Sequence, residues 1–101
     1  MLFDAILGTI GPLQKVSMIT GNQIRIARFA LRWSVQKLSD DSGVPVRTLK
    51  RIEATDGVPA TSAATLQVIK QVLDSAGIEF IGTPDDGPGI RVRPPKQQDP
   101  Q

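Results

Sequence analysis

The stretch WSVQKLSDDSGVPVRTLKRIE, Trp33 to Glu53, decides the fold of this chain, because two short helical patterns meet in it at a glycine. Ser34 is a favourable N-cap for the first helix, and Gly43 suits the end of that helix. Pro45 opens a second helix that runs to Glu53, since proline lacks only an amide that is free at a helix start. The apolar residues that we expect to hold the angle between the two helices are Leu38, Val44, Leu49 and Ile52.

Further helices are predicted on both sides of this stretch. Thr20 and Gln23 form a capping-box pattern at the start of a helix over residues 20–33. Either Thr61 or Ser62 can cap another helix, which Gly77 ends. Its apolar residues recur at helical spacing, so we expect the following to face inward: Leu66, Ile69, Val72, Leu73 and Ala76. Residues 54–60 are rich in turn-forming residues and are predicted to be a loop.

The periodicity changes after Gly77. Residues 78–81 and 90–93 alternate between apolar and polar side chains, and the Pro/Gly/Asp-rich segment 82–89 joins them, which predicts a β-hairpin over residues 78–93. A lone hairpin is only marginally stable in water, so it must pack on the helices or pair with another chain. The predicted fold is therefore mainly α, with about four helices over residues 18–77 and a short C-terminal hairpin.

The two ends of the chain are interpreted as additions to this domain. Residues 1–17 contain apolar side chains at helical spacing and suit a short amphipathic helix that could contact the domain or a protein partner. The alternative is that they are a leader before a native start at Met18. The polar, proline-rich composition of residues 94–101 predicts disorder.

The composition argues against an enzyme. The chain contains neither cysteine nor histidine. This removes disulfides, thiolate metal sites and histidine acid–base chemistry, and no phosphate-binding loop or cofactor motif is present. We therefore expect no catalytic residue, metal or cofactor. No apolar run is long enough to span a membrane, and the N-terminus lacks the leading cations of a signal peptide, so we expect a cytoplasmic protein.

Charge is distributed unevenly along the chain. Residues 22–53 carry seven Lys or Arg against three Asp or Glu, whereas residues 54–89 carry one against five. A basic segment beside an acidic one suggests a polyanionic partner for the basic one. The alternative interpretation is an ordinary solvated face.

The helix that begins at Pro45 carries the most specific signal for function. Val46, Arg47, Lys50 and Arg51 fall on one face of it. A helix fits the major groove of B-DNA, where arginine can bind O6 and N7 of guanine and valine can contact the methyl group of thymine. The alternative is a helical hairpin with a cationic, solvated face.

Arg28 is in conflict with its surroundings. It shares a helix face with Ile24, Ala27 and Leu31. An unpaired charge buried among apolar side chains costs several kcal/mol, so Arg28 requires a carboxylate partner.

The run MITGNQIRIAR, followed by WS, LSDDSGVPVRTLKRIEA and DGVP, resembles the Xre/Cro family of helix-turn-helix regulators, which are related to phage repressors. This likeness extends from Met18 to about Gln71. The later blocks AGIEFIG and GPGIRVR resemble a subgroup of short bacterial regulators in the same family, so the resemblance covers most of the chain.

The resemblance implies roles for individual residues. It places Val46, Arg47 and Arg51 at base-reading positions. Residues near the DNA backbone would be Thr48 and Lys50 of the recognition helix, and Ser34, Val35 and Gln36, which approach it through helix-terminal amides. It also matches Arg28 and Glu53 to a buried ion pair between the first helix and the recognition helix. Two residues depart from the family pattern: Val35 stands where glutamine is frequent, and Pro45 replaces the usual Ser or Thr cap.

The function implied is sequence-specific binding of double-stranded DNA by a transcriptional regulator, most simply a repressor acting as a homodimer. The C-terminal hairpin is the favoured dimer interface because its edge over residues 90–93 is open to pairing, with the fourth helix and residues 1–17 as alternatives. Arg91 and Arg93 could also reach phosphates beside the site. Two other functions fit the sequence: an antitoxin that represses its own operon, and a protein-interaction adaptor that does not bind DNA.

Overall fold

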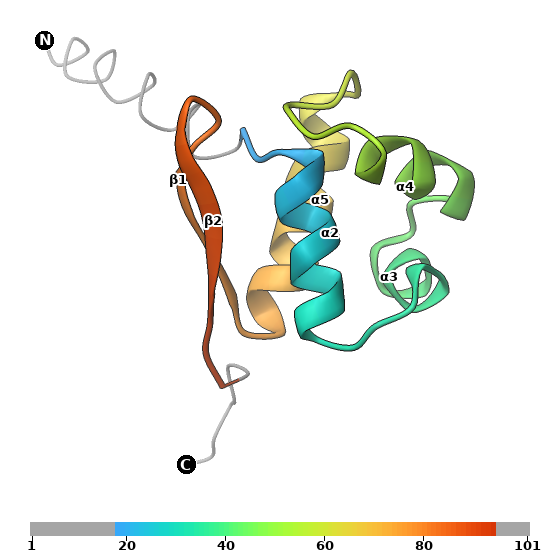
Figure 1. The fold of residues 1–101 in the computed structure, drawn as a ribbon. Helices are drawn as coiled ribbons and strands as arrows, with labels where there is room; N and C mark the ends of the chain where they lie inside the picture. Colours follow the sequence, from blue (N-terminus) through green and yellow to red (C-terminus); the bar gives the residue numbers. More distant parts are fainter. Residues whose placement is uncertain (1–17, 95–101) are drawn as a thin grey trace, which may run out of the picture.

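The computed structural model describes residues 18–94, so the expectations for residues 1–17 and 95–101 lie outside the described residues. Four helices precede a two-stranded antiparallel sheet in this part of the chain (Figure 1). The elements are α2 (Gly21–Ala30), α3 (Val35–Ser42), α4 (Val46–Glu53), α5 (Ala63–Ser75), β1 (Ile78–Thr83) and β2 (Asp86–Val92). The expected mainly α fold with a C-terminal hairpin is confirmed.

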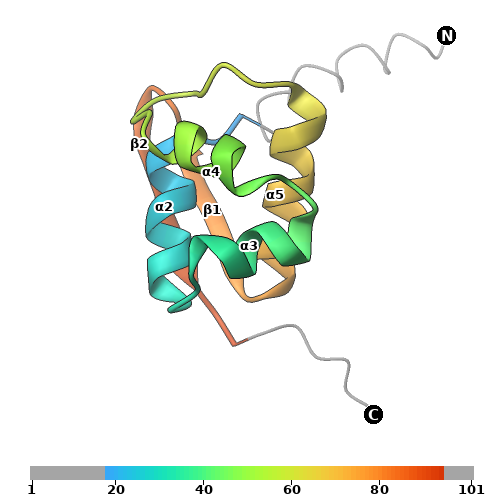
Figure 2. The ribbon, with the colours of Figure 1, turned by 90° about the vertical axis from the view of Figure 1, so that its right-hand side faces the viewer.

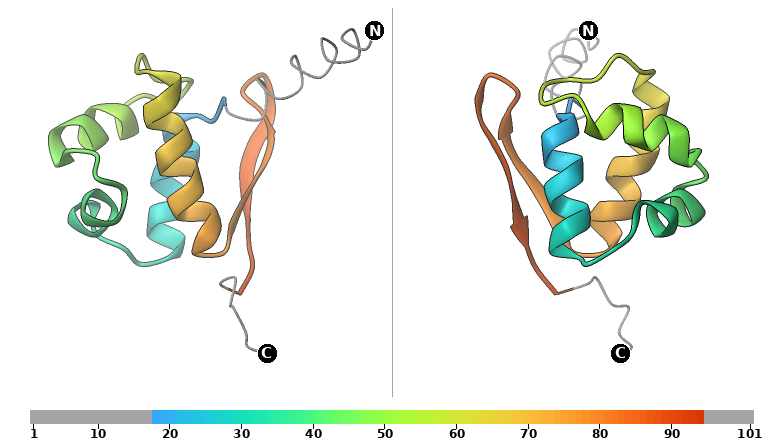
Figure 3. Two further views of the ribbon diagram at one scale, coloured as in Figure 1. Left: turned by 180° about the vertical axis from the view of Figure 1, so that it is seen from behind. Right: turned by 45° about the vertical axis from the view of Figure 1, so that its right-hand side comes forward.

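The elements form three layers. Helices α2 and α5 lie side by side in the middle, and the hairpin covers one side of this pair. Helices α3 and α4 lie on the other side, as both views of Figure 3 show. Figure 2 looks onto α3 and α4 with the hairpin behind. The hairpin and α4 are therefore on opposite sides of the described domain.

A single apolar core lies between these layers. Its members are fully or almost fully buried, as helical and strand periodicity requires: Ile19, Ile24, Ala27, Leu38, Val44, Leu49, Ile52, Leu66, Ile69, Leu73 and Ile78. Half-buried Trp33, Val72, Phe80 and Ile90 pack against it. Of the residues expected to face inward from α5, Ala76 lies past the last helical residue, as the C-cap.

Helix α2 begins as predicted and ends earlier. The Thr20 hydroxyl accepts the amide of Gln23 at 3.0 Å, and the Gln23 side chain accepts the amide of Thr20 at 2.9 Å, which completes the capping box. The prediction that the helix reaches Trp33 is wrong, because Arg32 adopts a left-handed conformation with φ 61°. The amide of Arg32 then donates to Phe29 O and that of Trp33 to Arg28 O, a Schellman ending that glycine usually provides.

The other helices have the predicted end residues. Ser34 caps α3 by accepting the amide of Lys37 at 3.0 Å, and Gly43 ends this helix with φ 79°. Ser62, rather than Thr61, caps α5 by accepting the amide of Thr65 at 3.1 Å. Gly77 follows α5 with φ 107°.

The hairpin has longer strands than predicted. Ile78 pairs with Val92, and Phe80 pairs with Ile90. Most of the expected turn over residues 82–89 is strand instead. The ladder continues past Gly82 through a register shift between Ile81 and Thr83, and Thr83 pairs with Asp86. A Cβ on Gly82 would lie 2.2 Å from the carbonyl oxygen of Gly87, so glycine permits this close approach.

Gln23 attaches the hairpin to the helices. Its side-chain nitrogen donates to Gly89 O at 2.8 Å and to Ile81 O at 3.2 Å, one carbonyl on each strand. Helix α2 contacts β2, and α5 contacts β1. The hairpin thus obtains the packing partner that a two-stranded sheet needs.

Candidate nucleic-acid interface

Apolar contacts with the core hold the buried face of helix α4 in place. The four expected anchors are all buried: Leu38, Val44, Leu49 and Ile52. Between the two helices, the Ser42 hydroxyl donates to Leu38 O at 2.7 Å and accepts the amide of Val44 at 3.2 Å. Pro45, the N-cap of α4, offers no side-chain cap. Ser42 therefore stabilises the turn from the preceding helix instead.

The two faces of α4 differ sharply in exposure. Leu49, Ile52 and Glu53 are buried. The side chains most exposed on the opposite face are Arg47, Lys50 and Arg51, and their neighbours Val46 and Thr48 are half-buried. The structure therefore brings the three predicted DNA-contacting cations together on one solvent-facing surface, which we call the α4 face (Arg47, Lys50 and Arg51).

The charges of the α4 face are not neutralised within residues 18–94, where no carboxylate forms an ion pair with any of its three cations. Arg51 donates instead to the backbone oxygen of Ala60 at 3.0 Å. Other cations in the basic segment do have carboxylate partners: Lys37 with Asp41 at 3.0 Å, for example. Apart from Arg32, the cations of the basic segment that have no carboxylate partner within residues 18–94 thus lie on α4.

The predicted ion pair between Arg28 and Glu53 is confirmed. Nε of Arg28 donates to Oε2 of Glu53 at 2.8 Å, and Nη2 donates to Oε1 at 2.7 Å. The exposed fractions of the two side chains are only 13% and 8%. The hydrogen bond to Glu53 raises the pKa of Arg28; burial opposes this shift, and the attraction of the carboxylate adds to it.

A second arginine of α2 holds the same end of α4. Arg25 donates to the backbone oxygen of Glu53 and to the side-chain oxygen of Asn22. It also approaches Asp56 at 3.4 Å. These contacts occupy Arg25 and, with the Arg28 pair, set the orientation of α4 against α2. Sequence reasoning did not identify this contact, because nothing local indicates that the acceptor is a backbone oxygen 28 residues away.

At the start of α3, the groups available to bind an anion are mainly those of the backbone. The Ser34 hydroxyl is occupied by its cap, and the Val35 side chain packs against the core. Gln36 is exposed and donates to Asp40 at 2.9 Å. The amides of the first turn of a helix have no intrahelical acceptor, so those of Val35 and Gln36 are the groups suited to an anion.

Arg32 is a candidate contact that the sequence interpretation omitted. It is exposed and lies in the turn that leads into α3, and no carboxylate pairs with it within residues 18–94. Its position two residues before the Ser34 cap was the available signal.

Arg91 and Arg93 are not part of this surface. Both contact Glu79 on the hairpin, at 3.3 Å and 2.7 Å. The hairpin lies across α2 and α5 from α4 (Figure 3). The expectation that these arginines reach phosphates beside the same site is therefore not supported by the fold.

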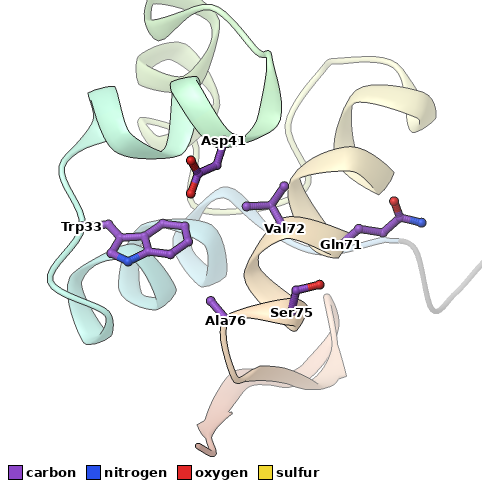
Figure 4. A pocket seen from close by; sticks show the side chains of 6 residues that line it. All are labelled: Trp33, Asp41, Gln71, Val72, Ser75 and Ala76. Atoms are coloured by element: carbon purple, nitrogen blue, oxygen red, sulfur yellow. The ribbon is translucent and has the colours of Figure 1, made fainter. Parts of the chain in front are cut away.

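A shallow hollow of about 400 Å³ lies between α3 and α5. Figure 4 shows the indole of Trp33 and the carboxylate of Asp41 facing Val72 and Ala76, while Gln71 points away from Trp33. Ser75 completes the lining. Asp41 is ion-paired with Lys37, and the ammonium of Lys37 lies 4.9 Å from the centre of the Trp33 ring. The floor is thus apolar, and its carboxylate already has a partner.

Residues 18–94 contain no group of three or more side chains arranged to hold a metal ion. No helix in that range is long and apolar enough to cross a membrane.

Comparison of the chain with protein-family models, curated proteins and solved structures finds no match.

Proposed function

We propose that this protein is a sequence-specific regulator that binds double-stranded DNA in the cytoplasm, most simply as a repressor, with a phage-repressor-like helix-turn-helix formed by α3 and α4. The observation that carries the proposal is the α4 face: three exposed cations that have no carboxylate partner in the described part of the chain, on a helix whose opposite face is fixed by the core and by Arg28–Glu53.

The electrostatics favour a polyanion. Like charges spaced three or four residues apart on a helix destabilise it by a few tenths of a kcal/mol per pair. Lys50 and Arg51 do lie in the last turn of α4, where cations interact favourably with the helix dipole, but Arg47 does not. DNA phosphates would relieve this repulsion and release counterions, which gives a binding energy that falls with salt.

Base reading is assigned to Val46, Arg47 and Arg51. Within residues 18–94 the side chain of Arg47 makes no hydrogen bond, whereas Arg51 must exchange its bond to Ala60 O for one to guanine. A hydrogen bond from a charged donor contributes about 1.5–3 kcal/mol at most, and less when exposed. A bidentate contact with guanine discriminates by about 1–3 kcal/mol. The loss of the bond to Ala60 O is therefore offset at guanine and left uncompensated at another base.

Backbone contacts are assigned to the edges of this surface. Thr48 and Lys50 belong to α4, while Ser34, Val35 and Gln36 supply amides at the N-terminus of α3, where the helix dipole favours phosphate. These contacts would position α4 without reading sequence.

Selection of bound sequences from a random duplex library is the decisive experiment. The full chain is expected to enrich one short motif. At physiological salt the chain should then bind a duplex that contains this motif more tightly than a shuffled duplex. Failure to enrich any motif, with equally weak binding of all duplexes, would overturn the proposal.

The hollow at Trp33 favours a second candidate function, an adaptor that binds a protein through an apolar side chain. Its floor combines an indole with Val72 and Ala76. An adaptor would retain binding to its partner when all three cations of the α4 face are replaced, and would lose it on Val72→Lys. The DNA-binding function predicts the opposite dependence for duplex binding.

A further inference from the structure

The outer edge of β2 is free to accept another strand within the described structure. The amide of Arg93 donates to Gly77 O at 2.7 Å, which makes these two residues a hydrogen-bonded pair of the ladder. Such pairs alternate with non-bonded ones in an antiparallel sheet. The backbone groups of Ile90 and Val92 are therefore directed away from β1. An unpaired row of this kind is a template for strand addition.

The two edges of the hairpin differ in what lies beside them. Beside β1, the ammonium of Lys70 is 6.0 Å from the centre of the Phe80 ring, and a lysine at an edge disfavours strand addition. Beside β2, Val92 is apolar and open to solvent, with an exposed fraction of 57%. The apolar edge is thus that of β2.

Helix geometry places the exposed part of α2 next to this edge. Gln23 touches the hairpin through Gly89, and Ala30 follows Gln23 on the same stripe of the helix. Helix α2 and strand β2 run in the same direction (Figure 1). Seven residues of helix and three of strand both advance about 10 Å, so Ala30 and Val92 lie at one level. We name this surface the β2 seam, which comprises Ile26 and Ala30 on the stripe of α2 that continues from Gln23, together with Ile90 and Val92 of β2.

We propose that the β2 seam binds a second copy of this chain. The two β2 strands pair antiparallel about a two-fold axis and form a four-stranded sheet in the order β1, β2, second β2, second β1. In the register that we assign, Ile90 lies opposite Ile90 of the second copy. The inner face then carries the continuous apolar row Phe80, Ile90, second Ile90 and second Phe80.

Charge and side-chain volume select this register. A shift that centres the axis on Arg91 would set two arginines directly opposite each other, which is destabilising. With the axis at Ile90, Arg91 faces Gly89 of the second copy, which has no side chain to obstruct it. Val92 then faces Pro88, whose carbonyl can accept the amide of Val92; proline has no amide to donate in return, so this pair supplies one hydrogen bond instead of two.

The two-fold axis also gives the two copies a common orientation. An axis perpendicular to the sheet leaves the helices of both copies on the same side of it. Because α4 lies across α2 and α5 from the hairpin (Figure 3), both α4 faces then point the same way. In this arrangement the two α4 faces could bind two half-sites of one DNA duplex, and this part of the inference rests on the proposed function. The self-association of the chain does not.

Sedimentation equilibrium of the full chain without DNA is the first test. The parent is expected at the mass of two chains and Val92→Lys at the mass of one, with thermal unfolding showing that the variant is folded. Val68→Lys is the matched control, because Val68 is an exposed valine on α5 with an exposed fraction of 38%. A monomeric parent, or a Val92→Lys variant that remains dimeric, overturns the proposal.

Single cysteines provide the second test, since the chain has none of its own. Under oxidation Ile90→Cys is expected to cross-link two chains, because opposite residues of a hydrogen-bonded pair have Cα atoms about 5.5 Å apart, within disulfide reach. Val92→Cys should not cross-link, because Val92 of the second copy lies about 13 Å further along the strand. Arg91→Cys cross-linking faster than Ile90→Cys overturns the register, and no cross-link at any of the three overturns edge pairing. A cross-linked dimer that selects no DNA motif would count against the proposed function alone.

Discussion

The guanidinium of Arg28 in α2 holds both carboxylate oxygens of Glu53 in α4, at 2.8 Å and 2.7 Å. Arg28 also donates to the backbone oxygen of Trp33 at 3.0 Å. One side chain therefore ties together the helix that forms the middle layer, the turn that leads into α3 and the last residue of α4. Helix α4 has only eight residues, too few to be stable alone, so contacts such as this one hold it in place and orient the α4 face.

Arg28→Ala should reduce the free energy of unfolding by about 3–5 kcal/mol, because it leaves the carboxylate of Glu53 buried without a partner. Urea unfolding followed by circular dichroism measures this loss. The double variant Arg28→Met with Glu53→Leu should recover much of it, since no charge is then left buried. A single variant that unfolds at the same urea concentration as the parent would show that the pair contributes little.

Arg47→Ala and Arg51→Ala should each weaken binding to the selected duplex by about 1–3 kcal/mol and relax the preference at one base pair. The reason is that each side chain is assigned to a base edge. Binding isotherms against the selected duplex and its single-base variants check this. Equal losses on specific and shuffled duplex in both variants would exclude base reading by these arginines.

Lys50→Ala should behave differently from the two arginine variants. A lysine that contacts phosphate adds the same binding energy at every sequence, so its loss should weaken all duplexes alike and reduce the slope of log K against log salt by about one. Binding measured over a series of salt concentrations gives this slope. Lys70→Ala on α5, away from the α4 face, is the control and should leave the slope unchanged.

Gln23→Ala should destabilise the domain by about 1–3 kcal/mol, because Gln23 is buried and serves both the capping box and the two hairpin carbonyls. Faster hydrogen exchange of the β2 amides would accompany this loss. Gln36→Ala is the matched control: the Gln36 side chain is exposed and, among residues 18–94, bonds only Asp40, so its loss should remain within about 0.5 kcal/mol. Unchanged exchange in β2 would mean that apolar packing alone holds the hairpin.

The hairpin should lose stability in acid. The hydrogen bond from Arg93 lowers the pKa of Glu79 below 4.5; burial opposes this shift, while the charges of Arg93 and Arg91 add to it. A lowered folded-state pKa means that the unfolded chain binds the proton more readily. This stabilisation is present above pH 4.5 and is lost as the pH falls through the folded-state pKa.

Carboxyl titration by NMR gives the pKa of Glu79 directly. In unfolding experiments the parent should be more stable than Glu79→Gln near neutral pH, and the two should converge in acid. A difference that persists below the folded-state pKa would show that the ion pairs are not its source.

Local chemistry determined much of this fold. Ser34, Gly43, Ser62 and Gly77 mark helix ends from the sequence because each acts on backbone groups within a few residues. The burial of Arg28 on an apolar stripe required an acid, and the family resemblance indicated Glu53. Mainly α architecture and the C-terminal hairpin follow from the change in apolar periodicity after Gly77.

Contacts between distant residues decided the rest. Arg32 ends α2 in a left-handed conformation that arginine rarely adopts, so tertiary packing overrode a helical pattern that continued to Trp33. The hairpin docks opposite α4 because Gln23 reaches carbonyls 58 and 66 residues away. Which cations remain unpaired also depends on such partners: Arg25 pairs with Asp56, 31 residues away, whereas no carboxylate within residues 18–94 pairs with the α4 face. The sequence determined that a basic helix exists, and the tertiary structure decided which of its charges remain available.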